Sequence, residues 1–590
     1  MKSVYRLKFY NRGSMQKRFL IIVISLLCFA GNIFSDELSR ELKEKIWSEA
    51  LKITQQMDDR QKVGQVLHFA IPGKSITEET KRELKKYTPG GVILFAYNLG
   101  TEKELMNLNT SLQEEMKKNK ALPLFISTDQ EGGKVIRVQD GVTEFPGAMA
   151  IGQAFDEKLA YKVGLSTSYQ LNRLGINLLL APDLDINNNP ENPVINIRSF
   201  GSDAERVVKM GLAYERGARV GGALPVIKHF PGHGDTTVDS HKGLPFIPKN
   251  KEDLLKLELI PFKKAIESGA SAVMSAHIIY PLIEKKYPAT LSRKILNNIL
   301  RKELGFDGMV MTDAMEMDAI SKNFQKKNTG SLAIYAGADV VLLVSWGENI
   351  KKYYNMIYTS LKKNKKFRKY LELAVARQVA AKIRTGLLHE EYSAIKIEDQ
   401  EIAEMIGRRK REALQEYTEI KSEGLESLNL NISQKAIRSY EEAFTPLDVE
   451  SLKNTYFFLG EKAFSEILKE EKLTNHSYKQ LATVLKKEGK KNIVLYTNKE
   501  KSTESVLKFL KKYEKREDLK FTILHGGNPF FPWPKKKNVK VLFSFSPTEA
   551  SKKALLLSLI GKYGTNPIPA ANLIFERKEK PEKPENGTNP

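Results

Sequence analysis

The segment "KHFPGHGDTTVDSH", residues 228–241, gathers three of the eight histidines in the chain together with two aspartates. Its Pro-Gly step interrupts regular structure, so we expect a loop that follows a strand. A metal-binding pair of histidines four residues apart requires a helix, which this step excludes for His229 and His233. Asp239 and His241 instead suit an acid/base pair, in which the carboxylate orients and tunes the imidazole. A purely structural role for the histidines is the alternative.

A further carboxylate, Asp313 in "MVMTDAMEM", ends a different apolar run and is a candidate nucleophile. An N-cap for the following helix is the alternative role. A carboxylate that attacks, combined with a group that first donates and then accepts a proton, is the arrangement of retaining glycosidases. In this chain His241 would take the place of the usual carboxylic acid.

The elements that must position these residues are short apolar runs, which alternate with longer amphipathic stretches. This rhythm predicts an α/β fold with a buried parallel sheet. Eight successive units favour a closed (β/α)8 TIM-type barrel over an open doubly wound sheet. The expected strands are residues 64–71, 90–98, 122–130, 177–186, 223–230, 271–280, 308–315 and 339–346.

Polar residues recur at the carboxyl ends of these expected strands. A barrel brings such ends together at one face, where enzymes of this architecture keep their active sites. The residues are Asn98, Asp129, Glu131, Asp183, Asp185, Lys228, His229, His277 and Asp313.

Four segments in order resemble the bacterial β-N-acetylglucosaminidases of glycoside hydrolase family 3, the NagZ-like enzymes. They are "DQEGGKVIR", "APDLDINNNPENPVINIRSFG", "KHFPGHGDTTVDSH" and "LGFDGMVMTDAMEM", and the resemblance runs through roughly residues 50–390. Family 3 β-glucosidases and β-xylosidases, the nearest alternative, usually take their acid/base from outside the first domain and lack this "DSH" loop.

The resemblance implies a role for each matching residue. Asp313 is expected to be the nucleophile, His241 the acid/base and Asp239 its partner. The sugar-binding positions are expected at Asp129, Arg137, Arg198, Lys228 and His229. Many family members carry two consecutive aspartates at the nucleophile, whereas Ala314 follows Asp313 here. Because the first aspartate is the nucleophile, activity is expected to survive.

The expected reaction is removal of a terminal β-linked N-acetylglucosamine (GlcNAc) from peptidoglycan fragments, through a covalent glycosyl-enzyme intermediate. Cell-wall oligosaccharides or muropeptides that contain GlcNAc are the expected partners. Phosphorolysis is an alternative, because a histidine acid/base removes a negative charge near the anomeric carbon. A surface carbohydrate-binding protein without turnover is the non-enzymatic alternative. No cofactor, metal or stable protein partner is expected.

The first 35 residues have the pattern of a signal peptide, and Met15 is a candidate start. Lys17 and Arg18 precede an apolar run that is short for a membrane span, and Ser35 suits a cleavage point. Lipid anchoring at Cys28, the only cysteine, is less favoured because bulky Leu27 precedes it. We therefore expect export to the periplasm or the exterior.

Composition and pattern divide the rest of the chain. The net charge of +23 is spread over the whole length and no nucleic-acid-binding motif is present, so nucleic acid is not an expected partner. "HGGNPFFPWP", residues 525–534, favours a tight surface turn over a sugar subsite. The expected parts are the signal peptide (1–35), the catalytic barrel (40–365), a helical linker (366–430), a smaller αβα sandwich-like domain (431–575) and a disordered tail (576–590).

Overall fold

The computed structural model describes residues 38–440, 444–513, 515–562 and 568–569. The predicted signal peptide, with Cys28, and the predicted tail at 576–590 lie outside the described residues. Among the described residues, no helix combines the length and the apolar character needed to cross a membrane.

Short parallel strands form the sheet of the first domain. Their apolar side chains are buried on both faces, as expected for strands covered by helices. The strands are β1 (Leu67–Ala70), β2 (Gly91–Ile93), β3 (Phe125–Thr128), β4 (Leu178–Leu179), β5 (Leu224–Pro225), β6 (Ile227–Phe230), β7 (Ala272–Ser275), β8 (Met309–Thr312) and β9 (Val341–Leu343).

These strands close into a barrel. One sheet has the order β5-β4-β3-β2-β1-β9 and another has β6-β7-β8. Parallel bridges between Asp183 and Lys228 and between Met311 and Val340 join the two sheets. Alternate residues of the strands, including Met309 and Met311, fill the interior, while Val310 faces the surrounding helices. The predicted barrel is confirmed, and all eight predicted strand regions contain a strand.

Helices surround the barrel and several begin at clear caps. Thr101 and Glu104, for example, form a reciprocal capping box at the start of α5. The helices are α2 (Arg40–Gln56), α3 (Asp59–Gln65), α4 (Glu78–Tyr87), α5 (Glu102–Lys118), α6 (Ala148–Ala154), α7 (Glu157–Arg173), α8 (Ala204–Gly221), α9 (Lys251–Lys256), α10 (Leu259–Glu267), η4 (Lys294–Glu303), α11 (Asp318–Ser321), α12 (Thr329–Ala336), α13 (Glu348–Lys363) and α14 (Lys365–Arg384). Short η turns are η1 (Ala96–Asn98), η2 (Asn196–Arg198), η3 (Ala289–Leu291) and η5 (Leu387–His389).

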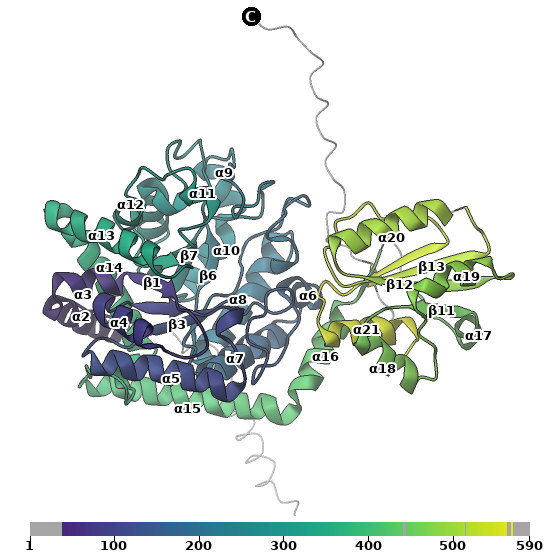
Figure 1. The fold of residues 1–590 in the computed structure, drawn as a ribbon, viewed down its shortest axis with the longest axis horizontal. Coiled ribbons are helices and arrows are strands. Elements are labelled where there is room, and N and C mark those ends of the chain that lie inside the picture. The colour runs from purple at the N-terminus through teal and green to yellow at the C-terminus, as the bar shows by residue number, and fades with distance from the viewer. Residues whose placement is uncertain (1–37, 441–443, 514, 563–567, 570–590) are drawn as a thin grey trace, which may run out of the picture.

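Two further helices connect the barrel to the second domain. α15 (Gln400–Glu423) packs against α7 and α8, and α16 (Leu425–Ala436) continues from it toward the smaller domain (Figure 1). Gly424, with φ of 92°, stands between them. α14 lies within the predicted linker and packs against α2.

The second domain contains one mostly parallel sheet, in which the order is β11-β12-β13-β14-β10-β15. Consecutive residues of β12 alternate between two hydrophobic clusters, with Ile493 in one and Val494 in the other, so helices cover both faces. The predicted sandwich is thus confirmed. Its elements are β10 (Arg438–Ser439), α17 (Val449–Lys453), β11 (Thr455–Phe458), α18 (Lys462–Glu470), η6 (Tyr478–Gln480), α19 (Leu481–Lys486), β12 (Lys491–Thr497), α20 (Glu500–Tyr513), β13 (Leu519–His525), β14 (Val539–Phe543), α21 (Glu549–Leu559) and β15 (Ile568–Pro569).

The second domain contacts the barrel near the loops that follow β3. Met149 and Ala150 of α6 share a hydrophobic cluster with Phe545 of the second domain. The Gly147 N–H donates to Ser546 Oγ at 3.4 Å. Because the loop between β3 and α6 also carries Glu131, the second domain supports one side of the candidate site.

Candidate active site

The site lies at the carboxyl ends of the barrel strands. Asp129 follows β3, Asp185 follows β4, Lys228 and His229 belong to β6, and Asp313 directly follows β8. Because parallel strands all end at the same face of a barrel, residues far apart in sequence meet there.

Asp313, the predicted nucleophile, is a half-buried carboxylate. The Ala314 N–H donates to its Oδ1 at 2.7 Å, which orients the carboxylate. Burial by itself raises the pKa of Asp313, but the neighbouring His277 and His229 rings and the Ala314 N–H outweigh it. The pKa of Asp313 therefore lies below its ordinary value, and the group is an anion, as a nucleophile must be.

His277 is a buried imidazole beside Asp313 that follows β7. Its Nδ1 lies 2.8 Å from Thr290 Oγ1 and its Nε2 lies 3.0 Å from the Ala314 carbonyl. A carbonyl only accepts, so Nε2 carries a hydrogen. Burial lowers the pKa of His277. His277 thus holds the backbone next to the predicted nucleophile in place.

Asp239 and His241 form the predicted pair on the loop after β6. Asp239 Oδ1 accepts the His241 N–H at 2.9 Å and lies 2.9 Å from its ring Nδ1. Burial by itself raises the pKa of Asp239, but the contacts with His241 lower this pKa by more than burial raises it. The carboxylate is therefore ionised. An ionised carboxylate only accepts, which assigns the hydrogen to Nδ1 and turns Nε2 away from Asp239.

The His241 side chain is 62% exposed. No hydrogen bond connects it to Asp313, although its charge contributes to lowering the pKa of that carboxylate. A loop that holds the predicted acid/base on the surface is able to close over a bound ligand.

Lys228 is fully buried and is fixed by three oxygens. Its Nζ lies 2.7 Å from Glu131, 3.2 Å from Asp129 and 2.6 Å from the Leu180 carbonyl. Burial alone lowers the pKa of Lys228, but Glu131 and Asp129 raise it by more, so the amine stays charged. The ammonium is thereby presented next to Asp129 in a defined position.

Arg198 is held by the same glutamate. It donates through Nε and Nη2 to both oxygens of Glu131, at 2.9 and 2.8 Å. This bidentate geometry fixes the plane of the guanidinium. Arg137 is looser, because its Nη2 lies 3.9 Å from Asp129 and a third of its side chain is exposed.

His229 rests on a buried carboxylate. Its ring Nδ1 lies 2.7 Å from Asp185 Oδ2, and Asp185 also accepts the N–H groups of His229 and His233. The pKa of Asp183, close by, is raised well above its ordinary value by burial and by the charge of Asp185. Asp183 therefore holds a proton more tightly than an ordinary aspartate, whereas the contacts with His229 and His233 lower the pKa of Asp185.

Asp183, Asp185 and His229 are also the one group among the described residues whose geometry could hold a metal ion, with ligand atoms within 4.8 Å of one another. Protein partners occupy much of this group. Three N–H groups already donate to Asp185, and the Arg198 cation lies 3.8 Å from Asp183. His233 uses both ring nitrogens, at 3.0 Å from Ser240 and from Thr236. The donor set therefore suits a hydrogen-bonded network better than an open metal site.

The structure thus joins Asp129, Lys228 and Arg198 into one network through Glu131, and places Asp239 against His241. Glu131, Asp185 and His277 were not among the predicted site residues, although each was recognised as a polar group at a strand end. Asn98 has a different role, because its amide donates to the carbonyls of Ile71 and Gly73 and so ties the loop after β2 to the segment after β1.

Comparisons with known proteins agree with this architecture. A model described as the glycosyl hydrolase family 3 N-terminal domain matches residues 59–380. Beta-hexosaminidase A of Pseudoalteromonas piscicida is 35% identical over 382 residues, which cover 60% of this chain and 63% of that relative. A beta-hexosaminidase of Nitrosomonas eutropha is 34% identical, over 47% of this chain and 80% of the relative. A family 3 beta-N-acetylglucosaminidase structure from Paenibacillus sp. has a TM-score of 0.74 at 29% identity, over 88% of this chain and 100% of that chain.

The chain belongs to glycosyl hydrolase family 3, as its four motifs predicted. It is therefore a glycoside hydrolase, and its relatives place it in the β-hexosaminidase group. A carbohydrate is accordingly its substrate.

Proposed function

We propose that the chain is an exo-acting, retaining β-N-acetylglucosaminidase that works through a covalent glycosyl-enzyme intermediate. The observation that carries the proposal is the ionised Asp313, which lies at the strand-end face together with the Asp239–His241 pair and the Lys228 network. Nucleophile, acid/base and polar sugar-binding groups are the three components that this reaction requires.

In the first step, Asp313 attacks the anomeric carbon while the bond from that carbon to the leaving oxygen breaks. His241, protonated at Nε2, gives its proton to the departing oxygen. Asp239 stabilises the charged ring before the transfer and keeps Nε2 directed away from itself. The products are a glycosyl ester on Asp313 and a neutral leaving alcohol.

In the second step, His241 accepts a proton from water at Nε2. The water oxygen attacks the anomeric carbon from the face that the leaving group vacated, and the ester bond to Asp313 breaks. Two inversions at the anomeric carbon give a product with the original β configuration.

The remaining predicted residues supply sugar binding in this proposal. The Asp129 carboxylate accepts hydrogens from sugar hydroxyls, while Lys228 and Arg198 donate to oxygens. His229 and Arg137 complete the set. Glu131 already holds the side chains of Lys228 and Arg198 in place before a sugar binds. Binding therefore costs little side-chain entropy at these two residues.

We also propose that the natural substrates are GlcNAc-containing cell-wall oligosaccharides or muropeptides, and that the protein is exported. Relatives named beta-N-acetylglucosaminidase or beta-hexosaminidase support the sugar. The export proposal rests on the signal-peptide pattern of the first 35 residues. Fractionation of cells that produce the full chain tests it, since the proposal fails when the protein stays in the cytoplasm.

The central experiment measures nitrophenol release from 4-nitrophenyl N-acetyl-β-glucosaminide and from the matching β-glucoside, with and without inorganic phosphate. Turnover of the N-acetyl substrate that is lost in Asp313→Ala supports the proposal. Turnover of the glucoside alone contradicts the proposed sugar. If the rate depends on phosphate and the product is a sugar 1-phosphate, the reaction is phosphorolysis and not hydrolysis. If the substrate binds but is not turned over, the proposal that the chain is catalytic is contradicted.

A further inference from the structure

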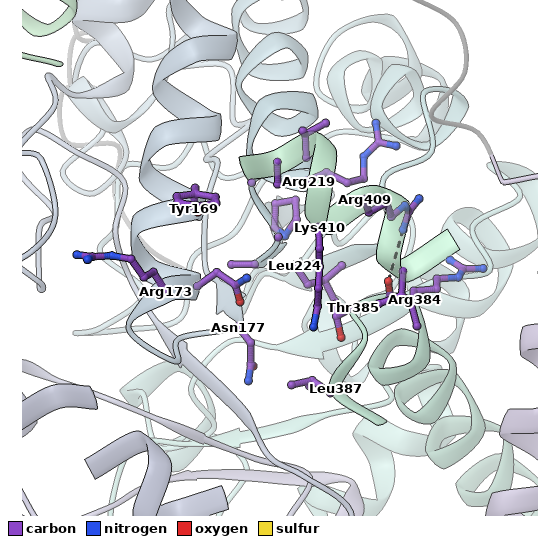
Figure 2. A pocket seen from close by; sticks show the side chains of 18 of the residues that line it. Tyr169, Arg173, Asn177, Arg219, Leu224, Arg384, Thr385, Leu387, Arg409 and Lys410 are labelled. Atoms are coloured by element: carbon purple, nitrogen blue, oxygen red, sulfur yellow. Dashed lines mark hydrogen bonds between the residues drawn. The ribbon is translucent and has the colours of Figure 1, made fainter. Parts of the chain in front are cut away.

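A cavity of about 490 Å³, whose lining side chains are drawn in Figure 2, lies in the first domain. Its wall includes Asn177, Ala223 and Ser271, which precede strands β4, β5 and β7. The candidate catalytic residues instead follow the carboxyl ends of the strands. The two ends of the strands form opposite faces of a parallel barrel, so this cavity is separate from the site described above.

Basic side chains outnumber acidic ones in the wall of this cavity. Glu390 is the acidic residue of the wall, and it lies 2.5 Å from Lys410. Two of the basic residues are paired with glutamates behind the wall, Arg173 with Glu102 and Arg219 with Glu215. The basic residues of the wall are Lys43, Arg173, Arg219, Arg384, Arg409 and Lys410. The cavity therefore carries more positive than negative charge and favours an anion.

Two arginines meet in this cavity from different helices. Arg384 ends α14, and Nη1 of Arg409 on α15 lies 3.5 Å from the Arg384 carbonyl. The Nε atom of Arg384 is buried and has no hydrogen-bond partner among the described residues. Burial lowers the pKa of Arg384, and the charge of Asp307 offsets this only in part. Because Arg384 lines the cavity, an oxyanion bound there would offset the cost of burying this charge.

The same cavity also has apolar walls. Leu414 of α15 and Met106 of α5 are 54% and 40% exposed. Leu387 and Tyr392 also line the cavity. A volume of about 490 Å³ lies within the range of cavities that bind small molecules.

We propose that this cavity binds a small amphiphilic oxyanion. A phosphate or carboxylate head lies against Arg384 and Arg409, and an apolar body packs on Met106 and Leu414. Guanidinium groups are suited to either head, because both present several acceptor oxygens. Since the cavity and the catalytic residues occupy opposite faces, the ligand binds alongside a sugar and does not compete with it.

The test is calorimetric titration of the full chain with hexyl phosphate, hexanoate and hexanol, each in the absence and in the presence of saturating GlcNAc. We expect hexyl phosphate, hexanoate or both to bind, and hexanol to bind at least about tenfold more weakly, because it lacks the charged head. Whichever of the two anions binds more tightly identifies the head. Equal binding of hexanol, absence of binding by both anions, or displacement of the anion by GlcNAc overturns the proposal.

Variants locate the site. Arg384→Gln is expected to weaken binding of the anion about tenfold or more, as loss of a charge-assisted hydrogen bond does. Arg408→Gln is the matched control, because Arg408 is 61% exposed, neighbours Arg409 on α15 and is absent from the cavity wall. Both variants are expected to keep wild-type turnover of the 4-nitrophenyl substrate. Equal effects of the two substitutions on anion binding overturn the proposal.

A second variant guards against a folding defect in Arg384→Gln. Leu414→Ala removes an exposed side chain, so it is expected to leave the Tm unchanged. It is expected to weaken hexyl phosphate binding while leaving binding of inorganic phosphate as in the wild type. Unchanged affinity for hexyl phosphate in this variant overturns the assignment of the apolar wall.

Discussion

Asp239 Oδ1 receives both the backbone N–H and the ring Nδ1–H of His241, each at 2.9 Å. The two contacts fix the ring against its own backbone, although the His241 side chain is mostly exposed. One carboxylate oxygen thus sets both the tautomer and the direction of the imidazole.

The first prediction concerns Asp239. Asp239→Asn keeps the shape of the residue but removes the ionised acceptor that assigns the hydrogen to Nδ1. We expect kcat to fall by about 10²- to 10⁴-fold, the range that acid/base catalysis contributes. The measurement compares 4-nitrophenyl N-acetyl-β-glucosaminide with a disaccharide that has a poorer leaving group. Equal losses on the two substrates would contradict a role through His241.

The second prediction concerns His241 itself. His241→Ala removes the proton donor, so a substrate with a poor leaving group is expected to lose about 10²-fold or more, while an activated aryl glycoside loses less. Azide needs no general base, and we expect it to accelerate the variant and to give a β-glycosyl azide. His476→Ala, at a half-buried histidine of the second domain, is the control. An α-azide product would argue against a glycosyl-enzyme intermediate.

The third prediction concerns Asp313, the proposed nucleophile. Asp313→Asn replaces an anion by a neutral amide of the same shape, so chemistry is expected to stop while sugar binding persists. A slow fluorinated GlcNAc glycosyl fluoride is expected to label the wild-type peptide that contains Asp313, and mass spectrometry reads the label. A label on another residue would transfer the role of nucleophile to that residue.

The fourth prediction uses the glycine turn that carries Glu131. Gly133 has φ of 57°, and a Cβ there would lie 2.6 Å from Gly147 Cα. Gly133→Ala is therefore expected to displace this loop, lower the Tm and weaken turnover through Glu131, Lys228 and Arg198.

Gly305→Ala is the matched control for the glycine turn, because Gly305 has φ of 71° and nothing within 4 Å of an added Cβ. It is expected to cost only about 1 kcal/mol of stability, from the left-handed conformation alone. Similar losses of activity in the two variants would contradict the steric argument.

The fifth prediction concerns Lys382, which is fully buried and donates to Gln65 Oε1 at 2.9 Å. Burial lowers the pKa of Lys382 from 10.5 to about 7. Above pH 7 the folded protein releases this proton, while the unfolded chain keeps it up to about pH 10.5. The contribution of Lys382 to the free energy of unfolding should therefore increase as the pH rises from about 7 to about 10.5.

The measurement for Lys382 is denaturant unfolding at several pH values between 7 and 10. Lys382→Met should remove a slope of up to about 1.4 kcal/mol per pH unit relative to the wild type. The comparison uses slopes, because the substitution also leaves Gln65 Oε1 without its donor. Parallel curves for the two proteins would mean that Lys382 remains charged in the folded state.

The aromatic segment at 525–534 shows where prediction from sequence failed. Its composition favoured a tight surface turn, yet Trp533 is 3% exposed and Phe530 is 4% exposed. The Trp533 Nε1–H donates to the Pro529 carbonyl at 2.8 Å, and its ring packs on Phe543. The surface-turn prediction is therefore wrong for these side chains. Turn residues show where the chain changes direction, but packing against the neighbouring strands and helices decides whether the side chains of the turn are buried.

The sequence by itself determined the succession of strands along the chain and the family. It also determined that the candidate site residues lie at the carboxyl ends of these strands. These properties are local, because alternation of apolar runs, a Pro-Gly break and a motif such as "DQEGG" are all written in neighbouring residues. The pairing of Asp239 with His241 was equally predictable, since only Ser240 separates them.

Only the tertiary structure decided that Glu131 joins Lys228 to Arg198, that the pKa of Asp183 is raised beside Asp185, and that two arginines line one cavity. Glu131 and Arg198 are 67 residues apart, and Arg384 meets Arg409 across two helices. Such contacts follow from closure of the barrel and from the path of α15. Burial and distance then set the charges, and neither can be read from the spacing of residues along the chain.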